Sequence, residues 1–199
     1  MSDQATQPKW ANPSPAGLVA LGVATFSFFA MLSGNVDSTA RLSAGIWLLG
    51  GFIVQIVVAL IDLRSNNTAG GNTFLFFSAF FMLVSGILLI LKWWLAKENL
   101  AVDFRIDGYV WIVLTLSLIL WTPAFFKSTK LLTLVILFLD CALPFITLMD
   151  LGVLPASYSM IPAVFMLLSG CTAIYLAAAI VVNTTFDKTV FPIPKPFIK

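Results

Sequence analysis

The stretch WANPSPAGLVALGVATFSFFAMLSGNV, residues 10–36, contains no charged residue. A helix needs about 20 mostly apolar residues to cross a bilayer, so this stretch is long enough for one crossing. The rest of the chain has the same character: 60% of its 199 residues are hydrophobic, 10% are charged, and the mean hydropathy is +1.00. Soluble domains carry roughly 25% charged residues. The composition therefore predicts an integral membrane protein.

Further charge-poor stretches follow at regular intervals along the chain. We expect an all-α integral membrane protein with a bundle of six transmembrane helices per protomer, at residues 15–36, 43–61, 72–94, 108–126, 131–150 and 158–183. These helices make residues 15–183 one membrane domain. Residues 1–14 and 184–199 are expected to be a cytoplasmic N-terminal segment and a cytoplasmic C-terminal tail.

The distribution of basic residues predicts the orientation of this bundle. An even number of spans places both termini on the same side of the membrane. The segments on that side hold Lys9, Arg64, Lys127, Lys130, Lys188, Lys195 and Lys199, and those on the other side hold Arg41, Lys92, Lys97 and Arg105. Because basic residues are in excess on the cytoplasmic side of membrane proteins, we expect a multi-pass protein of the cytoplasmic (inner) membrane with both termini inside.

Several kinds of chemistry are disfavoured by what the chain lacks. It has no histidine, its net charge is only +2, and its two cysteines, Cys141 and Cys171, both lie in apolar stretches. Histidine is the commonest metal ligand and a frequent general base, and a nucleic-acid interface needs a basic patch. We expect no catalytic residue, no metal ion, no cofactor and no nucleic-acid partner; the lipid bilayer is the expected surrounding.

Polar side chains within spans are the best candidates for function, because they are costly in lipid unless they face protein or water. Gln55 lies in the middle of the second span, Asn72 and Thr73 begin the third, and Tyr175 lies in the sixth. Serine and threonine hydroxyls commonly bond back to their own helix, which leaves their role structural. Gln55 does this less easily, so both a pore-facing and an interhelical role stay open.

Asp140 is a carboxylic acid near the centre of a predicted span. Acids at this depth often take part in proton relays, so Asp140 is a candidate for proton coupling. The alternative is a hydrogen-bonded residue near the kink that Pro144 would introduce one turn later. No lysine or arginine lies in the middle of a span, so a solute that crosses must be small, weakly held or neutral.

Motifs in chain order resemble the acetate uptake transporter family, the bacterial succinate–acetate permease type. NPSPAGL (12–18) is similar to its N-P-x-P-x-G-L signature, GGFIVQI (50–56) to its second helix, and GNTF (71–74) to the start of its third. AIYLAAAIVVN (173–183) and KTVFPI (188–193) match its last helix and tail. The resemblance implies six spans, a homohexamer, and a path in each protomer for acetate or similar small monocarboxylates, with succinate as a further substrate in some members.

The resemblance also implies positions along that path. We expect the path to be lined by Asn12, Pro13, Gly17, Gln55, Asn72, Thr73 and Tyr175, with Asn12, Gln55, Asn72 and Thr73 as its polar contacts. Family members narrow at a phenylalanine, a tyrosine and a leucine; the first position corresponds to Leu21, the last to Leu139, and the tyrosine has no clear counterpart here. Asp140 departs from the family pattern and lies beside Leu139.

The predicted function is therefore transport of acetate and similar small carboxylates, as a channel or as a proton-coupled permease. Two alternatives stay open: a membrane sensor or assembly subunit that transports nothing, and a channel for another small solute such as formate or lactate. The first helix start has two interpretations as well. Asn12, Pro13 and Pro15 form an ordinary capped helix start, or the positive end of that helix attracts a small carboxylate.

Overall fold

The computed structural model describes residues 10–198, and every regular element among them is helical. Residues 1–9 of the predicted N-terminal segment, Lys9 included, lie outside the described residues. In chain order the helices are α1 (Ser14–Leu32), α2 (Ala40–Arg64), α3 (Thr68–Phe76), η1 (Phe77–Val84), α4 (Ser85–Lys97), α5 (Arg105–Phe125), α6 (Lys130–Asp150), η2 (Ala156–Tyr158) and α7 (Met160–Phe186). α3, η1 and α4 follow one another without a break, so six helical segments of the described chain are long and apolar enough to cross a membrane. The predicted fold class is confirmed.

The helices begin and end where local chemistry favours it. Pro15 lies in the first turn of α1, where a missing N–H costs no helical hydrogen bond. α1 ends at Leu32 rather than at residue 36, because Gly34 adopts a left-handed φ of 73°. The N–H of Asn35 then bonds to the carbonyl of Ala30, and the N–H of Gly34 bonds to that of Met31, which closes the helix.

The middle of the third span is a π-helix. In η1 each turn holds more residues than an α-turn, and the Ser85 hydroxyl donates to the carbonyl of Phe80, five residues back, at 3.1 Å. π-helical turns are rare and frequent at functional sites. Here the widened turn leaves Phe77 and Phe81 both fully buried, with their ring centroids 5.3 Å apart.

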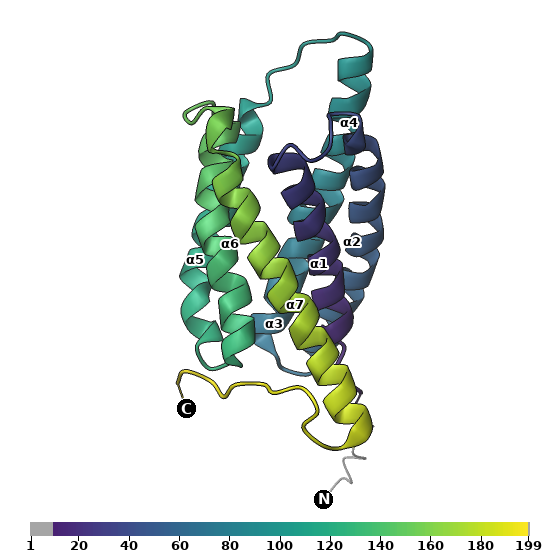
Figure 1. Cartoon of the computed structure of the whole chain (residues 1–199), viewed down its shortest axis with the longest axis vertical. Coiled ribbons are helices and arrows are strands. Elements are labelled where there is room, and N and C mark those ends of the chain that lie inside the picture. The colour runs from purple at the N-terminus through teal and green to yellow at the C-terminus, as the bar shows by residue number, and fades with distance from the viewer. Residues whose placement is uncertain (1–9, 199) are drawn as a thin grey trace, which may run out of the picture.

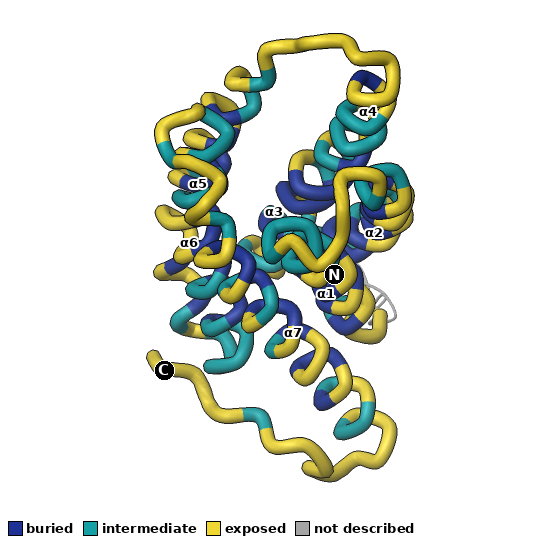
Figure 2. The backbone as a smooth tube through the Cα atoms, turned by 45° about the horizontal axis from the view of Figure 1, so that its top comes forward, coloured by how far each residue is buried: buried dark blue, intermediate teal, exposed yellow. Residues whose placement is uncertain are grey.

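The packing order of the helices differs from the chain order. α1 packs against α2, α2 against the third span, α5 against α6 and α6 against α7, whereas α7 also packs against α1 and thereby brings the two ends of the bundle's chain order together (Figure 1). α3 makes only a weak contact with α5. Buried positions recur along each helix with exposed ones between them, and the exposed ones include large apolar side chains such as Leu120 and Ile53 (Figure 2).

The C-terminal tail crosses the end of the bundle where both termini lie (Figure 1). At its start, the Asn183 side chain accepts from the N–H groups of Val190 and Phe191 and donates to the Phe191 carbonyl. At its end, the N–H of Ile198 donates to the carbonyl of Phe126 in the turn between α5 and α6 at 3.1 Å. The tail is thus fixed at both ends of its path.

Candidate functional site

Two cavities lie at opposite ends of the bundle. The proximal cavity, of about 360 Å³, is on the side of the termini and is lined by Asn12, Ser14, Leu18, Asp62, Asn67, Gly70, Phe74, Lys127, Ser128, Thr129, Leu132, Leu176, Ile180 and Pro196. The distal cavity, of about 260 Å³, is at the other end and is lined by Phe28, Met31, Leu32, Arg41, Phe81, Ser85, Leu88, Leu89, Lys92, Asp107, Trp111, Ile146, Met149 and Asp150. Each cavity contains charged side chains of both signs, so each suits a hydrated ion better than an apolar ligand.

Four of the spans contribute residues to both cavities, and three of them, α1, the third span and α6, do so with apolar side chains. α1 lines them with Leu18 and Phe28, the third span with Phe74 and Phe81, and α6 with Leu132 and Ile146. Residues three, four or seven positions apart lie on the same face of a helix. The positions between them on these faces hold fully buried apolar side chains: Leu21, Phe77 and Leu139.

An apolar segment therefore separates the two cavities. Leu21 is 3% exposed, Phe77 is 1% exposed and Leu139 is 0% exposed, and all three belong to the same core cluster. Sequence reasoning selected Leu21 and Leu139 but left the third position empty. Phe77 occupies the matching place on the third span; the only hint in the sequence is the run of phenylalanines after Asn72, which does not say which ring points inward.

Gln55 and Gly17 contact each other directly. The Gln55 Nε2 donates to the carbonyl of Gly17 at 3.1 Å, so the glutamine bridges α2 and α1. A side chain at Gly17 would place its Cβ within 3.0 Å of three atoms of the Phe74 ring, so only glycine lets that ring pack here. Gln55 Oε1 is buried and has no hydrogen-bond partner within residues 10–198. A buried acceptor of this kind calls for water or a solute donor.

The first helix turn lies at the proximal cavity. α1 begins at Ser14, so Asn12 precedes the N-cap residue Pro13 rather than being the cap itself. The Asn12 Oδ1 still accepts from the Ser14 N–H at 3.0 Å. Asn12 lines the proximal cavity, and Pro13 lines a shallow depression between α1 and α7 together with Asn12.

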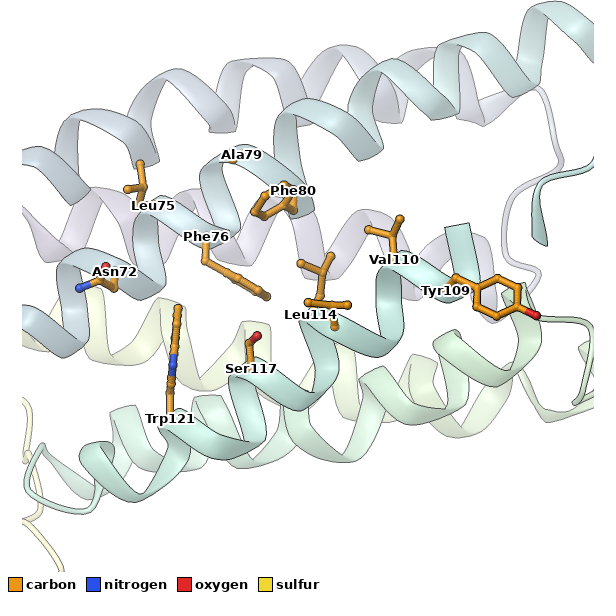
Figure 3. A pocket seen from close by; sticks show the side chains of 11 residues that line it. Asn72, Leu75, Phe76, Ala79, Phe80, Tyr109, Val110, Leu114, Ser117 and Trp121 are labelled. Carbon is orange, nitrogen blue, oxygen red and sulfur yellow. The ribbon is translucent and has the colours of Figure 1, made fainter. Parts of the chain in front are cut away.

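Asn72 and Thr73 lie away from both axial cavities. They line a lateral groove between the third span and α5, which consists of two adjoining hollows of about 730 and 420 Å³. Figure 3 shows Asn72 and Trp121 at one end of this groove, with Phe76, Phe80 and Leu114 beyond them. The Asn72 side chain donates to the Thr68 carbonyl of its own helix. The Thr73 hydroxyl is buried without a partner in the described chain.

Tyr175 lies on the outside of α7 and holds the tail. Its hydroxyl donates to the carbonyl of Pro192 at 3.0 Å, and its ring packs edge-on against Phe191. The structure therefore brings together Gly17, Gln55 and the apolar segment, with Asn12 at the proximal end. It places Asn72, Thr73 and Tyr175 elsewhere.

Asp140 lies between α6 and α5, outside both axial cavities. The Thr122 hydroxyl is 2.6 Å from its Oδ2 and 2.9 Å from the carbonyl of Leu118. A hydroxyl carries one hydrogen, so it can donate to only one of these two oxygens at a time. Asp140 Oδ1 is buried without a partner in the described residues. The acid thus has an unused oxygen next to a switchable donor.

Asp62 is a residue of the proximal cavity that sequence reasoning missed. It is 3% exposed, and its Oδ2 accepts from Asn67 Nδ2 at 3.1 Å. The Asn67 Oδ1 accepts in turn from the Gly70 N–H, which fixes the start of α3. Asp62 falls just beyond the predicted second span at 43–61, and nothing in the sequence distinguishes it from a loop residue. No group of three or more possible metal ligands occurs among residues 10–198.

Comparison with known proteins identifies the family of this chain. The sequence matches the GPR1/FUN34/yaaH family over residues 2–196. The chain belongs to the GPR1/FUN34/yaaH family. This confirms the relationship predicted from the motifs, and it extends over nearly the whole chain.

The chain is similar to two named proteins and to one solved structure. The chain is 30% identical to the succinate-acetate/proton symporter SatP of Escherichia coli (strain K12), covering 93% of this chain and 96% of that protein. It is 27% identical to the meiotically up-regulated gene 86 protein of Schizosaccharomyces pombe, of which it covers 62%. Among solved structures, the bacterial acetate channel SatP matches 93% of this chain with a TM-score of 0.77 and 26% identity.

Proposed function

We propose that this protein conducts acetate and similar small monocarboxylates across the cytoplasmic membrane, with succinate as a further substrate. The likeness to the SatP proteins over 93% of the chain carries this proposal. The two axial cavities separated by Leu21, Phe77 and Leu139 support it, because a path needs wetted ends and a selective narrowing.

Each part of the interior has a role in this proposal. Carboxylic acids have a pKa of about 4, so acetate reaches the protein as an anion. Asn12 and Gln55 supply amide N–H groups that replace part of its hydration. Gly17 has no side chain, so the Phe74 ring can pack against α1 there, and its carbonyl accepts from Gln55. Leu21, Phe77 and Leu139 then discriminate by size. The role is one of transport rather than catalysis.

Asp140 is the residue at which we propose that a proton is coupled to transport. Its carboxyl group has one oxygen against Thr122 and one without a partner, and it lies next in the chain to Leu139 of the apolar segment. Gain or loss of a proton at Asp140 would redirect the Thr122 hydroxyl between Asp140 and the Leu118 carbonyl. α5 and α6 would then repack beside the narrowing.

Uptake of radiolabelled acetate into proteoliposomes tests the function. We expect uptake above that of protein-free liposomes, reduced by unlabelled formate, lactate or succinate according to how well each acid is accepted. Acetamide, which has acetate's size without its charge, should compete poorly. Uptake no higher than that of protein-free liposomes would favour a sensor or assembly subunit instead. Uptake inhibited equally by acetamide would favour a path for another small solute.

We also propose that the protein assembles as a homohexamer with both termini cytoplasmic. The hexamer rests on the family resemblance, and the orientation rests on the excess of basic residues at the end of the bundle that carries the termini. Native mass spectrometry of the detergent-solubilised protein should give six times the 21.7 kDa protomer mass. A monomer or dimer as the dominant species would contradict the hexamer.

A further inference from the structure

The distal cavity contains four charged side chains from four helices. Arg41 comes from the first turn of α2, Lys92 from α4, Asp107 from the first turn of α5, and Asp150 from the last turn of α6. The apolar segment closes the cavity on one side, so a solute on its way through the bundle meets these charges immediately before or after the narrowing. Their pairing decides which of them can hold an anion.

Lys92 is already neutralised within the cavity. Its Nζ lies 2.8 Å from the Asp107 Oδ2 and 4.5 Å from the centroid of the Phe104 ring. Both side chains of this ion pair are largely covered, with 24% of the lysine and 12% of the aspartate side chain exposed. Asp150 lies within electrostatic reach of the same pair. Lys92 therefore already interacts with two carboxylates, and it is poorly placed to bind the carboxylate of a solute as well.

Arg41 is the unpaired cation of the cavity. Its side chain makes no hydrogen bond or ion pair with any residue of the described chain, although it is partly buried against the cavity wall. It is also the second residue of α2. A cation there faces the positive end of the helix dipole, which is unfavourable. An anion bound beside Arg41 would pair with the guanidinium and would also interact favourably with the positive end of the helix.

We propose that Arg41 forms a carboxylate-binding subsite in the distal cavity. The planar guanidinium binds a carboxylate through two parallel N–H···O bonds. The Trp111 and Phe28 rings, which line the same cavity and both pack against Phe81, offer an apolar wall for the methyl end of acetate. Asp107 and Asp150 oppose a second negative charge, so the subsite favours a monocarboxylate over a dicarboxylate. This inference rests on the proposed function.

The concentration dependence of acetate uptake in proteoliposomes tests this subsite. Arg41→Gln should raise the half-saturating acetate concentration about fivefold, as expected for loss of one partly screened charged contact, and should weaken its dependence on ionic strength. Arg41→Lys should keep much of the affinity, because it keeps the charge. Lys97→Gln is the matched control: it removes one positive charge at the same end of the bundle, but Lys97 lies over the Trp93 ring outside the cavity.

The outcomes separate the subsite from the function. A half-saturating concentration that is unchanged in Arg41→Gln, in a protein that does transport acetate, overturns the subsite and leaves the proposed function standing. An equal rise in Arg41→Gln and Lys97→Gln also overturns it, because the effect would then come from general surface charge. An absence of acetate uptake in the unaltered protein overturns the proposed function itself, and the subsite with it.

Discussion

At the scale of single residues, two polar side chains of the spans, Gln55 and Asp140, each have one buried oxygen atom without a hydrogen-bond partner in the described residues. Gln55 uses its amide N–H to hold Gly17, which leaves Oε1 unpaired, and Asp140 uses Oδ2 against Thr122, which leaves Oδ1 unpaired. Most other hydroxyls in the spans are satisfied locally; Thr25 and Thr172, for example, donate to carbonyls of their own helices. The unpaired atoms are therefore the exceptions, and exceptions of this kind in a membrane protein point to function.

Asp140→Asn tests the role of this acid. Asparagine keeps the size of the side chain and can still contact Thr122, but it cannot gain or lose a proton. We expect acetate uptake in proteoliposomes to lose its dependence on an imposed proton gradient. Asp103→Asn is the control, because Asp103 lies in the exposed loop before α5, where the Arg105 side chain and N–H hold its pKa at about 2 and keep it charged. Coupling that persists in Asp140→Asn would assign this carboxyl group a structural role.

At the scale of helices, close approach of backbones holds the bundle together. Gly45 of α2 and Gly86 of α4 face each other, so that a Cβ added at Gly45 would lie 2.6 Å from the Gly86 carbonyl oxygen. Lipid is as apolar as the helix surfaces, so packing of this kind, rather than the hydrophobic effect, drives helix association in membranes.

Gly45→Ala should therefore destabilise the bundle. The added methyl group meets backbone atoms, which cannot move aside like a flexible side chain, and overpacking costs about 1–3 kcal/mol. Gly50→Ala lies on the same helix with nothing within 4 Å of its Cβ, so it should have little effect. Thermal melting in detergent measures the difference. Equal melting temperatures for the two variants would show that the α2–α4 contact accommodates the added methyl group without loss of stability.

The tail provides a second test at this scale. Asn183→Ala removes three hydrogen bonds to residues 190 and 191. We expect trypsin to cut after Lys188 on the order of 100-fold faster, because three lost bonds at about 1 kcal/mol each make local opening of the tail easier by about 3 kcal/mol. Thr185→Ala, which alters a hydroxyl bonded only within α7, should not change the rate. Mass spectrometry of the released peptides gives the rates, and equal rates would mean that other contacts hold the tail.

At the scale of the whole molecule, the six spans place the two termini and the α5–α6 turn at one end of the bundle (Figure 1). The loop between α1 and α2 lies at the other end. The proposed orientation therefore makes a prediction about which loops face the cell exterior.

Single cysteines in these loops test the orientation. In a background with Cys141 and Cys171 replaced by alanine, Ser38→Cys in the α1–α2 loop should react with a membrane-impermeant maleimide in intact cells. Ser128→Cys in the α5–α6 turn should react only after the cells are permeabilised. Ser157→Cys, between α6 and α7, serves as a second exterior position. The reverse pattern would place both termini outside.

The sequence by itself determined the class of protein, the six spans and the family. Each of these depends on properties local to a segment: the length and apolarity that a bilayer requires, and short motifs in order along the chain. Which side chains face the interior was decided only by the tertiary structure. Asn72 and Thr73 line the lateral groove, Tyr175 holds the tail, and Phe77 completes the apolar segment through a π-helical turn. The physical reason is that lipid and core are equally apolar. A spanning helix therefore shows no clear alternation between a polar outer face and an apolar inner face, and only its packing against its neighbours determines which residues meet in the middle.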